Sequence, residues 1–534
     1  MRQIGFKNFR RFENFPALDL APITIFVGEN NAGKSTVVKG ILALSDFLNR
    51  WRDDDVDFYL EERERKSEKK RKNALLRRLK NQKFYFNTSY LAHIGTFTRA
   101  LYNKASEGII TFSSSLGIMD ITIDVMGDRN DEESVTGIIS KVKVAFKPNG
   151  VTASFDLQND MAQIIFEPIT IEQIQRGPFN PRKKDEVIEF CNKNTEPVSI
   201  SFNISDYYRM FAPDLISALT SSVEVALNAT LDIARTEKMI DTDIFGKLQP
   251  IPNLSNQTLG FLKSYTESIC GSSMSSRNER QMFRLPGTRL PMRLFNIEYL
   301  YAHAVTQTVI YSAKDTNDYL SRTIHEFASL PKTEDDYRRE FITRWMKEFG
   351  IGKNYLINSV GGEAHIVKIQ NNDEEWVNLS DKGMGSIQLM VLLFRLAITL
   401  PKHPIADEDA RKRAIIRSRM SRIVIIEEPE QNLHPMLQSK LADLLFRLNE
   451  DYGYRFIIET HSEYLIRKTQ VIVKENFNDI KRPLSENPFK VYYFNSTSSD
   501  KPYYEIVYQN DGNFSNDFGK GFFDEASNLA FEIL

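Results

Sequence analysis

The stretch that decides the fold is GENNAGKST, residues 28–36. An apolar run, 23–27, precedes it, and a segment with helical character, 37–49, follows it. A strand, a glycine-rich loop and a helix in this order form an anion cradle, because the loop N–H groups and the helix N-terminus converge. Lys34 can reach the outer phosphates of a nucleotide, and the Ser35 hydroxyl can ligate Mg²⁺. The pattern predicts a nucleoside triphosphate site.

The whole loop takes part in this prediction. A chance glycine-rich turn is the alternative, and the strand-to-helix context disfavours it. The residues expected to bind the nucleotide are Gly28, Asn30, Asn31, Ala32, Gly33, Lys34, Ser35 and Thr36.

Length and composition bound the class of protein. A chain of 534 residues with 41% hydrophobic and 26% charged residues is expected to fold into two to four globular units. Two distant cysteines, Cys191 and Cys270, argue against a disulfide framework. The N-terminus lacks an apolar signal core, and no run approaches the roughly 18 apolar residues of a membrane span. We therefore expect a cytoplasmic protein that does not enter a membrane.

Two basic runs are candidates for nucleic-acid contact. The net charge is 69 − 71 = −2, so only the distribution of charge is informative. Residues 61–80 carry ten basic and four acidic side chains, and residues 411–422 carry six basic side chains and no acid. A solvated helix face is the alternative interpretation of such runs.

The first third of the chain reads as strands. Residues 3–6 and 8–12 predict two strands before the phosphate loop. Five short strands then follow, separated by turn residues, and predict an antiparallel meander. These strands are expected at 109–113, 119–125, 139–146, 151–156 and 163–167.

The middle of the chain is expected to be mainly a helical insertion. Its apolar periodicity predicts a helix at 215–239, and a tract rich in Pro, Ser and Gly follows at 250–291. Without sustained heptads, a long coiled coil is not expected.

Regular structure resumes after residue 296. Helices are predicted at 318–328 and 335–349, then strands at 355–359, 365–369 and 376–379. A glycine-rich turn, LSDKGMGSIQ at 379–388, opens an apolar helix that is expected at 386–400.

An acid-tipped strand supplies candidate catalytic residues. Residues 422–426 read as a central parallel strand that delivers EEPEQNLHP, 427–435, to the carboxyl edge of a sheet. Glu427 is expected in the metal shell, and Glu428 is expected to deprotonate the attacking water. The alternative is that both are ordinary helix-capping acids. A second apolar strand, 456–458, ends in ETHSEYLI, where His461 is expected to sense the γ-phosphate as a catalytic residue.

The order of these parts resembles a known architecture. Over residues 1–168 and 297–475 the chain looks like the ABC-type ATPase heads of the SMC-like and OLD-like families. The resemblance implies an α/β fold, an ABC-type P-loop ATPase head with a mixed β-sheet core, an antiparallel β subdomain and a helical insertion. It also implies the binding and hydrolysis of ATP with Mg²⁺.

The resemblance identifies LSDKGMGSIQ as a signature motif that is presented to the ATP of a second subunit. It therefore implies a homo-oligomer, a dimer or a multiple of dimers, whose heads sandwich ATP. The residues expected to contact the γ-phosphate are Ser380, Gly383, Gly385 and Ser386, and which serine donates stays open.

The chain departs from the family pattern at two points. Glu427 stands where many members have Asp. No glutamine occupies an obvious metal-contacting position in 86–105, and Gln82 and His93 are imperfect candidates for that role.

The tail narrows the resemblance. DGNFSNDFGKGFFDEA, residues 511–526, is similar to the C-terminal signature of bacterial ABC-type ATPases of anti-phage defence, including those of Septu and retron systems. That group implies an ATPase that regulates a small HNH nuclease partner. No nuclease site of the chain's own is expected, because only about 70 residues follow His461, too few for a Toprim domain.

The sequence thus predicts four parts. These are an ATPase lobe at 1–168 with a charged insertion at 50–83, an insertion at 169–295, a second lobe at 296–475, and an extension at 476–534. Two other functions stay open beside a defence ATPase. One is a DNA-repair or maintenance ATPase that clamps duplex DNA, and the other is a nucleotide-binding scaffold with little turnover.

Overall fold

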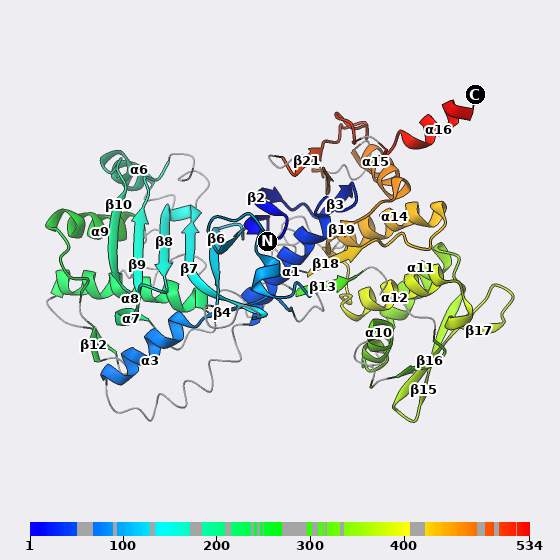
Figure 1. Ribbon diagram of the computed structural model, residues 1–534, viewed down its shortest axis with the longest axis horizontal. Helices are drawn as coiled ribbons and strands as arrows, with labels where there is room; N and C mark the ends of the chain where they lie inside the picture. The colour runs from blue at the N-terminus through cyan, green and yellow to red at the C-terminus, as the bar shows by residue number, and fades with distance from the viewer. Residues whose placement is uncertain are drawn as a thin grey trace. The chain divides into compact units, whose positions relative to one another are not determined.

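The fold was analysed on a computed structural model of the chain (Figure 1). It forms two compact units, unit 1 (Met1–Asp19 and Lys39–Phe295) and unit 2 (Leu20–Val38 and Asn296–Leu534). The structure describes residues 1–50, 68–88, 93–128, 134–170, 173, 184–208, 215–236, 240–242, 246–248, 250–269, 296–301, 308–312, 314, 318–331, 336–405, 422–477, 486–495, 501–519 and 521–533.

Unit 1 is built on a nine-stranded sheet with the order β10-β9-β8-β7-β6-β5-β1-β2, in which β4 also pairs with β7. Every pair in it is antiparallel, so the predicted meander is confirmed. The strands are β1 (Gln3–Phe9), β2 (Phe12–Asp19), β4 (Lys83–Tyr85), β5 (Ile109–Ser115), β6 (Met119–Gly127), β7 (Thr136–Phe146), β8 (Val151–Asp156), β9 (Met161–Phe166) and β10 (Val198–Asn203).

The N-terminal hairpin differs from the prediction. β1 continues to Phe9 instead of ending at residue 6, and β2 starts at Phe12. The reversal falls between them because Arg10 adopts a positive φ of 53° and Phe9 faces Phe12 across the turn. Phe6, Phe9 and Phe12 are buried in the core of unit 1.

Helices complete unit 1: α9 contacts both α6 and α8, and α8 also contacts β8. The predicted helix at 215–239 is confirmed as α8, although it ends at residue 236, before β11. The elements are α3 (Glu68–Lys80), α4 (Phe97–Ala100), α6 (Lys184–Lys193), α7 (Ile204–Tyr207), α8 (Leu215–Thr236), α9 (Asn256–Ser268), β11 (Ile240–Thr242) and β12 (Gly246–Leu248). The predicted insertion at 169–295 also supplies a strand, β10, to the large sheet.

Unit 2 contains a six-stranded sheet with the order β13-β18-β19-β3-β20-β21. The first five strands are parallel, and β21 is antiparallel to β20. The strands are β13 (Asn296–Leu300), β18 (Arg422–Glu427), β19 (Arg455–Glu459), β3 (Ile23–Gly28), β20 (Phe489–Phe494) and β21 (Tyr503–Ile506). The acid-tipped strand β18 is therefore separated from the phosphate-loop strand β3 by β19.

The helices and a second, smaller sheet complete the unit 2 core, and the predicted segments between 318 and 400 are confirmed. The helices are α10 (Tyr319–Ala328), α11 (Tyr337–Glu348), α12 (Met384–Ile398), α14 (Pro435–Tyr452), α15 (Glu463–Phe477) and α16 (Glu525–Ile533). The smaller sheet contains β14 (Tyr311–Ser312), β15 (Asn354–Val360), β16 (Ala364–Gln370) and β17 (Trp376–Asn378). Helix α1 (Lys34–Arg50) starts in unit 2 and ends in unit 1.

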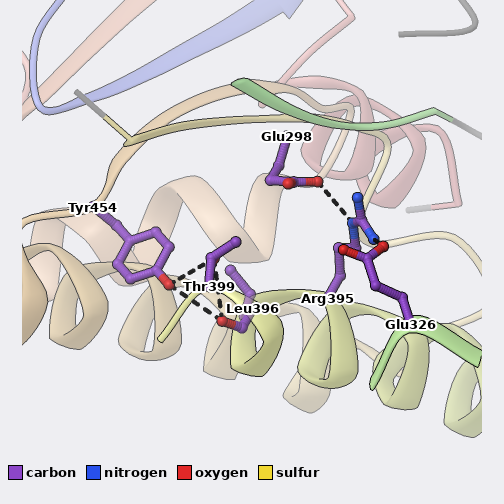
Figure 2. Close-up of polar contacts among 6 residues, drawn as sticks. All are labelled: Glu298, Glu326, Arg395, Leu396, Thr399 and Tyr454. Carbon is purple, nitrogen blue, oxygen red and sulfur yellow. Dashed lines mark hydrogen bonds and ion pairs between the residues drawn. The ribbon is translucent and has the colours of Figure 1, made fainter. Parts of the chain in front are cut away.

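A polar network ties α12 to the sheet edge (Figure 2). Arg395 on α12 donates to Glu298 on β13 at 2.7 Å and also forms an ion pair with Glu326 on α10. One turn after Arg395, the hydroxyl of Thr399, the C-cap of α12, lies 2.9 Å from the hydroxyl of Tyr454. These contacts fix the long axis of α12 against β13, and so they set where its N-terminal turn lies.

The α/β class with a mixed sheet and a separate antiparallel sheet is thus confirmed. The predicted division into four parts stays a prediction. In the described part of the chain, no helix is both long and apolar enough to span a membrane.

Candidate functional site

The phosphate loop joins the carboxyl end of β3 to the start of α1, as the sequence predicts. Gly28 and Gly33 have φ values of +125° and +106°, which side chains rarely adopt. A Cβ on Gly28 would also lie 2.2 Å from the backbone oxygen of Phe494 on the neighbouring strand. The backbone conformation of the loop therefore requires glycine at both positions.

Lys34 lies inside the loop and is only 4% exposed. Its ammonium donates to the backbone oxygens of Gly28 at 3.0 Å and Glu29 at 2.9 Å. Burial lowers the pKa of Lys34, against the opposing effect of nearby carboxylates, first among them Glu459. Around it, Asn30 and Asn31 are exposed, Ala32 is buried, and Ser35 and Thr36 are half-buried.

Glu459 is a site residue that our sequence interpretation missed. It ends β19, is 6% exposed, and accepts a hydrogen bond of 2.9 Å from the Ser35 hydroxyl through its Oε1. A usable signal was present, since Glu459 ends an apolar strand just as Glu427 does. The carboxyl ends of parallel strands share one edge of a sheet, and this rule would have placed both acids together.

Glu427 and Glu459 are register partners at the ends of β18 and β19. The Tyr299 hydroxyl, on β13, hydrogen-bonds to the carboxylate of Glu427. Burial and the negative charge of Glu427 raise the pKa of Glu459 to about 7, although Ser35 and Lys34 act in the opposite direction. The site therefore holds a buried acid, Glu459, beside a half-buried one, Glu427.

Glu428 follows directly with an unusual backbone, a φ of +47°. Its N–H donates to the backbone oxygen of Glu459 at 2.7 Å, and its side chain accepts a hydrogen bond from Gln431. A non-glycine residue at positive φ is uncommon and often marks a functional site. The strand β18 ends at Glu427, and the chain turns at Glu428.

His461 lies in the same site, two residues after Glu459. Its backbone N–H donates to Glu430 Oε1 at 2.6 Å, which fixes the start of the segment that leads to α15. Desolvation of the imidazole and the nearby Lys34 ammonium lower the pKa of His461, while Glu428 acts in the opposite direction. The ring is therefore neutral at pH 7 and can donate a hydrogen bond without a charge.

The two candidate signature serines differ in exposure. Ser380 is 5% exposed, and its hydroxyl donates to Asp381 at 3.3 Å. Ser386 is half-buried in the first turn of α12, next to the exposed N-cap residue Gly383. Gly385 faces inward, because a Cβ there would lie 2.4 Å from the backbone oxygen of Asn432.

The start of α12 thus packs on the loop that follows β18 in the same chain. Gln388 Nε2 lies 3.4 Å from the backbone oxygen of Glu428. The structure brings Lys34, Ser35, Glu427, Glu428 and His461 together, with the signature turn against the loop of the two acids.

The remaining candidates lie elsewhere. Gln82 is buried and His93 is exposed, and both belong to unit 1. Of the first basic run, residues 68–80 form α3, whereas 61–67 lie outside the described residues. Of the second run, 411–421 lie outside them as well.

The donor set fits Mg²⁺. Ser35, Glu427 and Glu459 offer only oxygen atoms, which Mg²⁺ prefers. Among the described residues, Glu459 Oε2 is buried with no hydrogen-bond partner. Within the same residues, no group of three or more His, Cys, Asp or Glu side chains is arranged to hold a metal alone. This agrees with an ion that also takes phosphate oxygens from a nucleotide.

Comparison with solved structures gives distant likenesses to SMC heads. The SMC head with an extended coiled coil bound to the C-terminal domain of ScpA, from Pyrococcus furiosus, has a TM-score of 0.31 and 10% identity, covering 100% of this chain and 98% of that one. The SMC head of Thermotoga maritima has a TM-score of 0.30 and 8% identity, covering 95% of this chain and 100% of that one. An SMC head bound to the C-terminal winged-helix domain of ScpA has a TM-score of 0.34 and 10% identity, covering 95% of this chain and 98% of that one.

No curated protein matches the sequence. The family model for the AAA ATPase domain, AAA_15, matches residues 1–466, which is most of the chain. The chain therefore belongs to this family of AAA-type P-loop ATPases.

Proposed function

We propose that the chain binds and hydrolyses ATP with Mg²⁺ at the phosphate loop. The observation that carries the proposal is the hydrogen bond from Ser35 to Glu459, with Lys34 beside it, at one edge of a parallel sheet. This edge is where α/β folds bind ligands. Membership of an ATPase family supports the same activity.

The loop and Lys34 bind the triphosphate. The N–H groups of 28–36 and the N-terminus of α1 supply the cradle. The Lys34 ammonium donates to the carbonyl oxygens of Gly28 and Glu29. It can exchange these contacts for phosphate oxygens with little movement of its backbone.

Ser35 and Glu427 would hold the metal. When bound, Mg²⁺ neutralises charge on the β- and γ-phosphates. Tyr299 keeps the Glu427 carboxylate in place by donating a hydrogen bond to it. The tyrosine and Glu427 come from neighbouring parallel strands, so this orientation is built into the sheet.

Glu428 and His461 act on the attacking water and the γ-phosphate. Glu428 accepts the proton of the water as general base. Its positive φ and its hydrogen bond from Gln431 hold the carboxylate in one orientation. His461, neutral because its pKa is lowered, donates a hydrogen bond to the γ-phosphate.

The signature turn serves the ATP of a second copy of the chain. We assign Ser386 rather than Ser380 as the donor, because Ser386 lies accessible in the first turn of α12 and Ser380 is buried. Gly383 leaves open space beside the turn, with no atom within 4 Å of a Cβ placed there. ATP occupancy would then favour pairing of two heads, which makes it a switch.

The defence role rests on the tail. Residues 511–526, which resemble the tail of the Septu ATPase PtuA, form an aromatic cluster with Phe518 at its centre. Arg467 on α15 lies over the ring of Phe523 at 4.1 Å. We propose that the ATP-dependent oligomer regulates an HNH nuclease like PtuB, as in Septu and retron systems.

Phosphate release tests the enzymatic part. Lys34→Ala is expected to lose ATP binding and turnover. Glu428→Gln is expected to bind ATP, hydrolyse it at least about 100-fold more slowly, and accumulate as a larger oligomer in light scattering. Turnover of Glu428→Gln at the wild-type rate would contradict the assignment of the base. A basal rate unaffected by Lys34→Ala would favour a scaffold.

Co-expression tests the partner. The chain is expected to co-purify with an HNH protein encoded beside it, and the nuclease activity of the complex is expected to depend on ATP. A complex whose cutting is the same with wild type and with Lys34→Ala would contradict regulation by nucleotide. Ser386→Ala, with Ser380→Ala as its matched control, tests the donor, and only the first is expected to weaken ATP-dependent pairing.

A further inference from the structure

The order of strands gives Glu459 a central place at the site. β19 lies between the phosphate-loop strand β3 and the acid-tipped strand β18. Glu459 is aligned with Glu427 on one side and with Phe26 on the other. Its carboxylate is thus nearer to the loop than that of Glu427 by one strand.

Among the described residues, only one of the two carboxylate oxygens of Glu459 has a hydrogen-bond partner. Oε1 accepts the hydrogen bond from Ser35, the residue that the proposed function places on the metal. Oε2 is buried and, within the described part of the chain, has no hydrogen-bond partner. Burial of a carboxylate oxygen without a partner is unfavourable unless a cation or donor compensates it.

Among the described residues, Lys34 is the cation that acts electrostatically on this carboxylate. Lys34 is nearby, but its ammonium donates to two backbone oxygens of the loop. Glu427 and Glu428 are both close enough to act electrostatically on Glu459. Glu459 thus has two carboxylates and one ammonium as charged neighbours, and this excess of negative charge suits a divalent cation.

We propose that Glu459 is a ligand of the divalent cation that accompanies the nucleotide, so that β19 supplies a metal-binding carboxylate in addition to Ser35 and Glu427. The inference rests on the proposed function and names one more residue of the same site.

A purely structural role makes a different prediction. If Glu459 only orients Ser35, then Glu459→Gln should behave like wild type, because the glutamine oxygen can accept the same hydrogen bond. If Glu459 binds the cation, the loss of charge weakens metal binding even though the hydrogen bond remains. The substitution therefore separates the two roles.

The experiment measures ATP affinity of the full chain by calorimetry, in excess Mg²⁺ and in EDTA. Wild type is expected to bind ATP more tightly with Mg²⁺. Glu459→Gln is expected to lose about 10- to 100-fold of that Mg²⁺-dependent gain, as is usual when a metal site loses a supporting group. Its affinity in EDTA should be equal or higher, because one negative charge near the phosphates is gone.

Mn²⁺ binding provides a readout that does not depend on turnover. Titration followed by electron paramagnetic resonance, with ATP present, is expected to show a 10- to 100-fold weaker Mn²⁺ affinity for Glu459→Gln. Glu298→Gln is the matched control, a buried strand glutamate of the same sheet, and it should leave the affinity unchanged. Glu459→Asp keeps the charge and should recover part of the Mn²⁺ affinity. This variant still tests the proposal if Glu459→Gln folds poorly.

The outcomes distinguish the two proposals. If wild type binds no ATP under either condition, the proposed function fails. If wild type shows the Mg²⁺-dependent gain and Glu459→Gln keeps all of it, the proposed function stands and the role of Glu459 is overturned. Equal Mn²⁺ affinities of wild type, Glu459→Gln and Glu459→Asp would overturn it as well.

Discussion

Two strands of the parallel sheet each carry a glutamate that is largely removed from solvent, and the two side chains are compensated in different ways. Glu298 on β13 accepts a hydrogen bond of 2.7 Å from Arg395, which also pairs with Glu326 (Figure 2). Glu459 on β19 accepts one from a neutral hydroxyl, Ser35, and faces further carboxylates.

The difference separates a structural charge from a functional one. Burial raises the pKa of both glutamates. For Glu298 the guanidinium of Arg395 opposes this effect, whereas for Glu459 the charge of Glu427 adds to it and only the weaker effects of Ser35 and Lys34 oppose it. A buried ion pair of this kind holds α12 on β13. A buried acid whose nearest charged neighbours are mostly acids costs stability in the absence of a ligand, as binding sites often do.

Loss of Arg395, the ion-pair partner of Glu298, should have the largest effect on the free energy of unfolding. Arg395→Met leaves Glu298 buried without its partner and is expected to cost about 3–5 kcal/mol of unfolding free energy. Urea denaturation of the full chain measures it. The double variant Arg395→Met, Glu298→Gln should recover part of the loss. A single-variant loss below about 1 kcal/mol would show that the network is not structural.

Substitution of Glu459 should have the opposite effect and stabilise the folded chain. The folded pKa of about 7 lies above the ordinary value of 4.5, so the folded state binds this proton more tightly than the unfolded state. Stability is therefore lost as pH rises from 4.5 through 7, by up to about 3 kcal/mol. In EDTA, Glu459→Gln should exceed wild type by up to that amount at pH 8 and match it near pH 4. A difference that does not vary with pH would contradict this reasoning.

The Tyr299 hydroxyl, which donates a hydrogen bond to Glu427, provides the next test. Tyr299→Phe removes a hydrogen bond to a carboxylate and is expected to cost about 2 kcal/mol at pH 8, within the range for bonds to charged groups. Urea unfolding at pH 8 and pH 5 measures it. A cost below about 0.5 kcal/mol at pH 8 would show that this hydrogen bond does not hold the Glu427 carboxylate in place.

A tyrosine on the structural side should have the smallest effect. The Tyr454 hydroxyl lies 2.9 Å from that of Thr399 and 3.2 Å from the backbone oxygen of Leu396 (Figure 2). Tyr454→Phe removes only neutral hydrogen bonds and is expected to cost about 1 kcal/mol. That cost should be the same at pH 8 and pH 5. A pH-dependent cost would mean that this network is coupled to a titrating group.

Local patterns made much of the fold predictable from the sequence. The loop around Lys34 and the acids after β18 were found because each motif lies within a few residues and has a fixed strand context. The five meander strands were found because they are short and turn residues separate them. Each of these signals is contained in one segment of the chain.

The parts that were missed depend on distant segments. The role of Glu459 depends on the position of β19 between β3 and β18, and its partner Ser35 is 424 positions away. The choice between Ser380 and Ser386 depends on burial, which the motif does not show. The N-terminal hairpin was misplaced because its turn relies on a positive φ at Arg10, a residue without a turn preference.

Anomalous diffraction from crystals grown with Mn²⁺ and a non-hydrolysable ATP analogue tests the central claim most directly. We predict one Mn²⁺ peak at bonding distance from the Ser35 hydroxyl and from a carboxylate oxygen of Glu459, with the phosphates in the 28–36 loop. A peak that contacts neither residue, or phosphates bound outside that loop, would contradict the account.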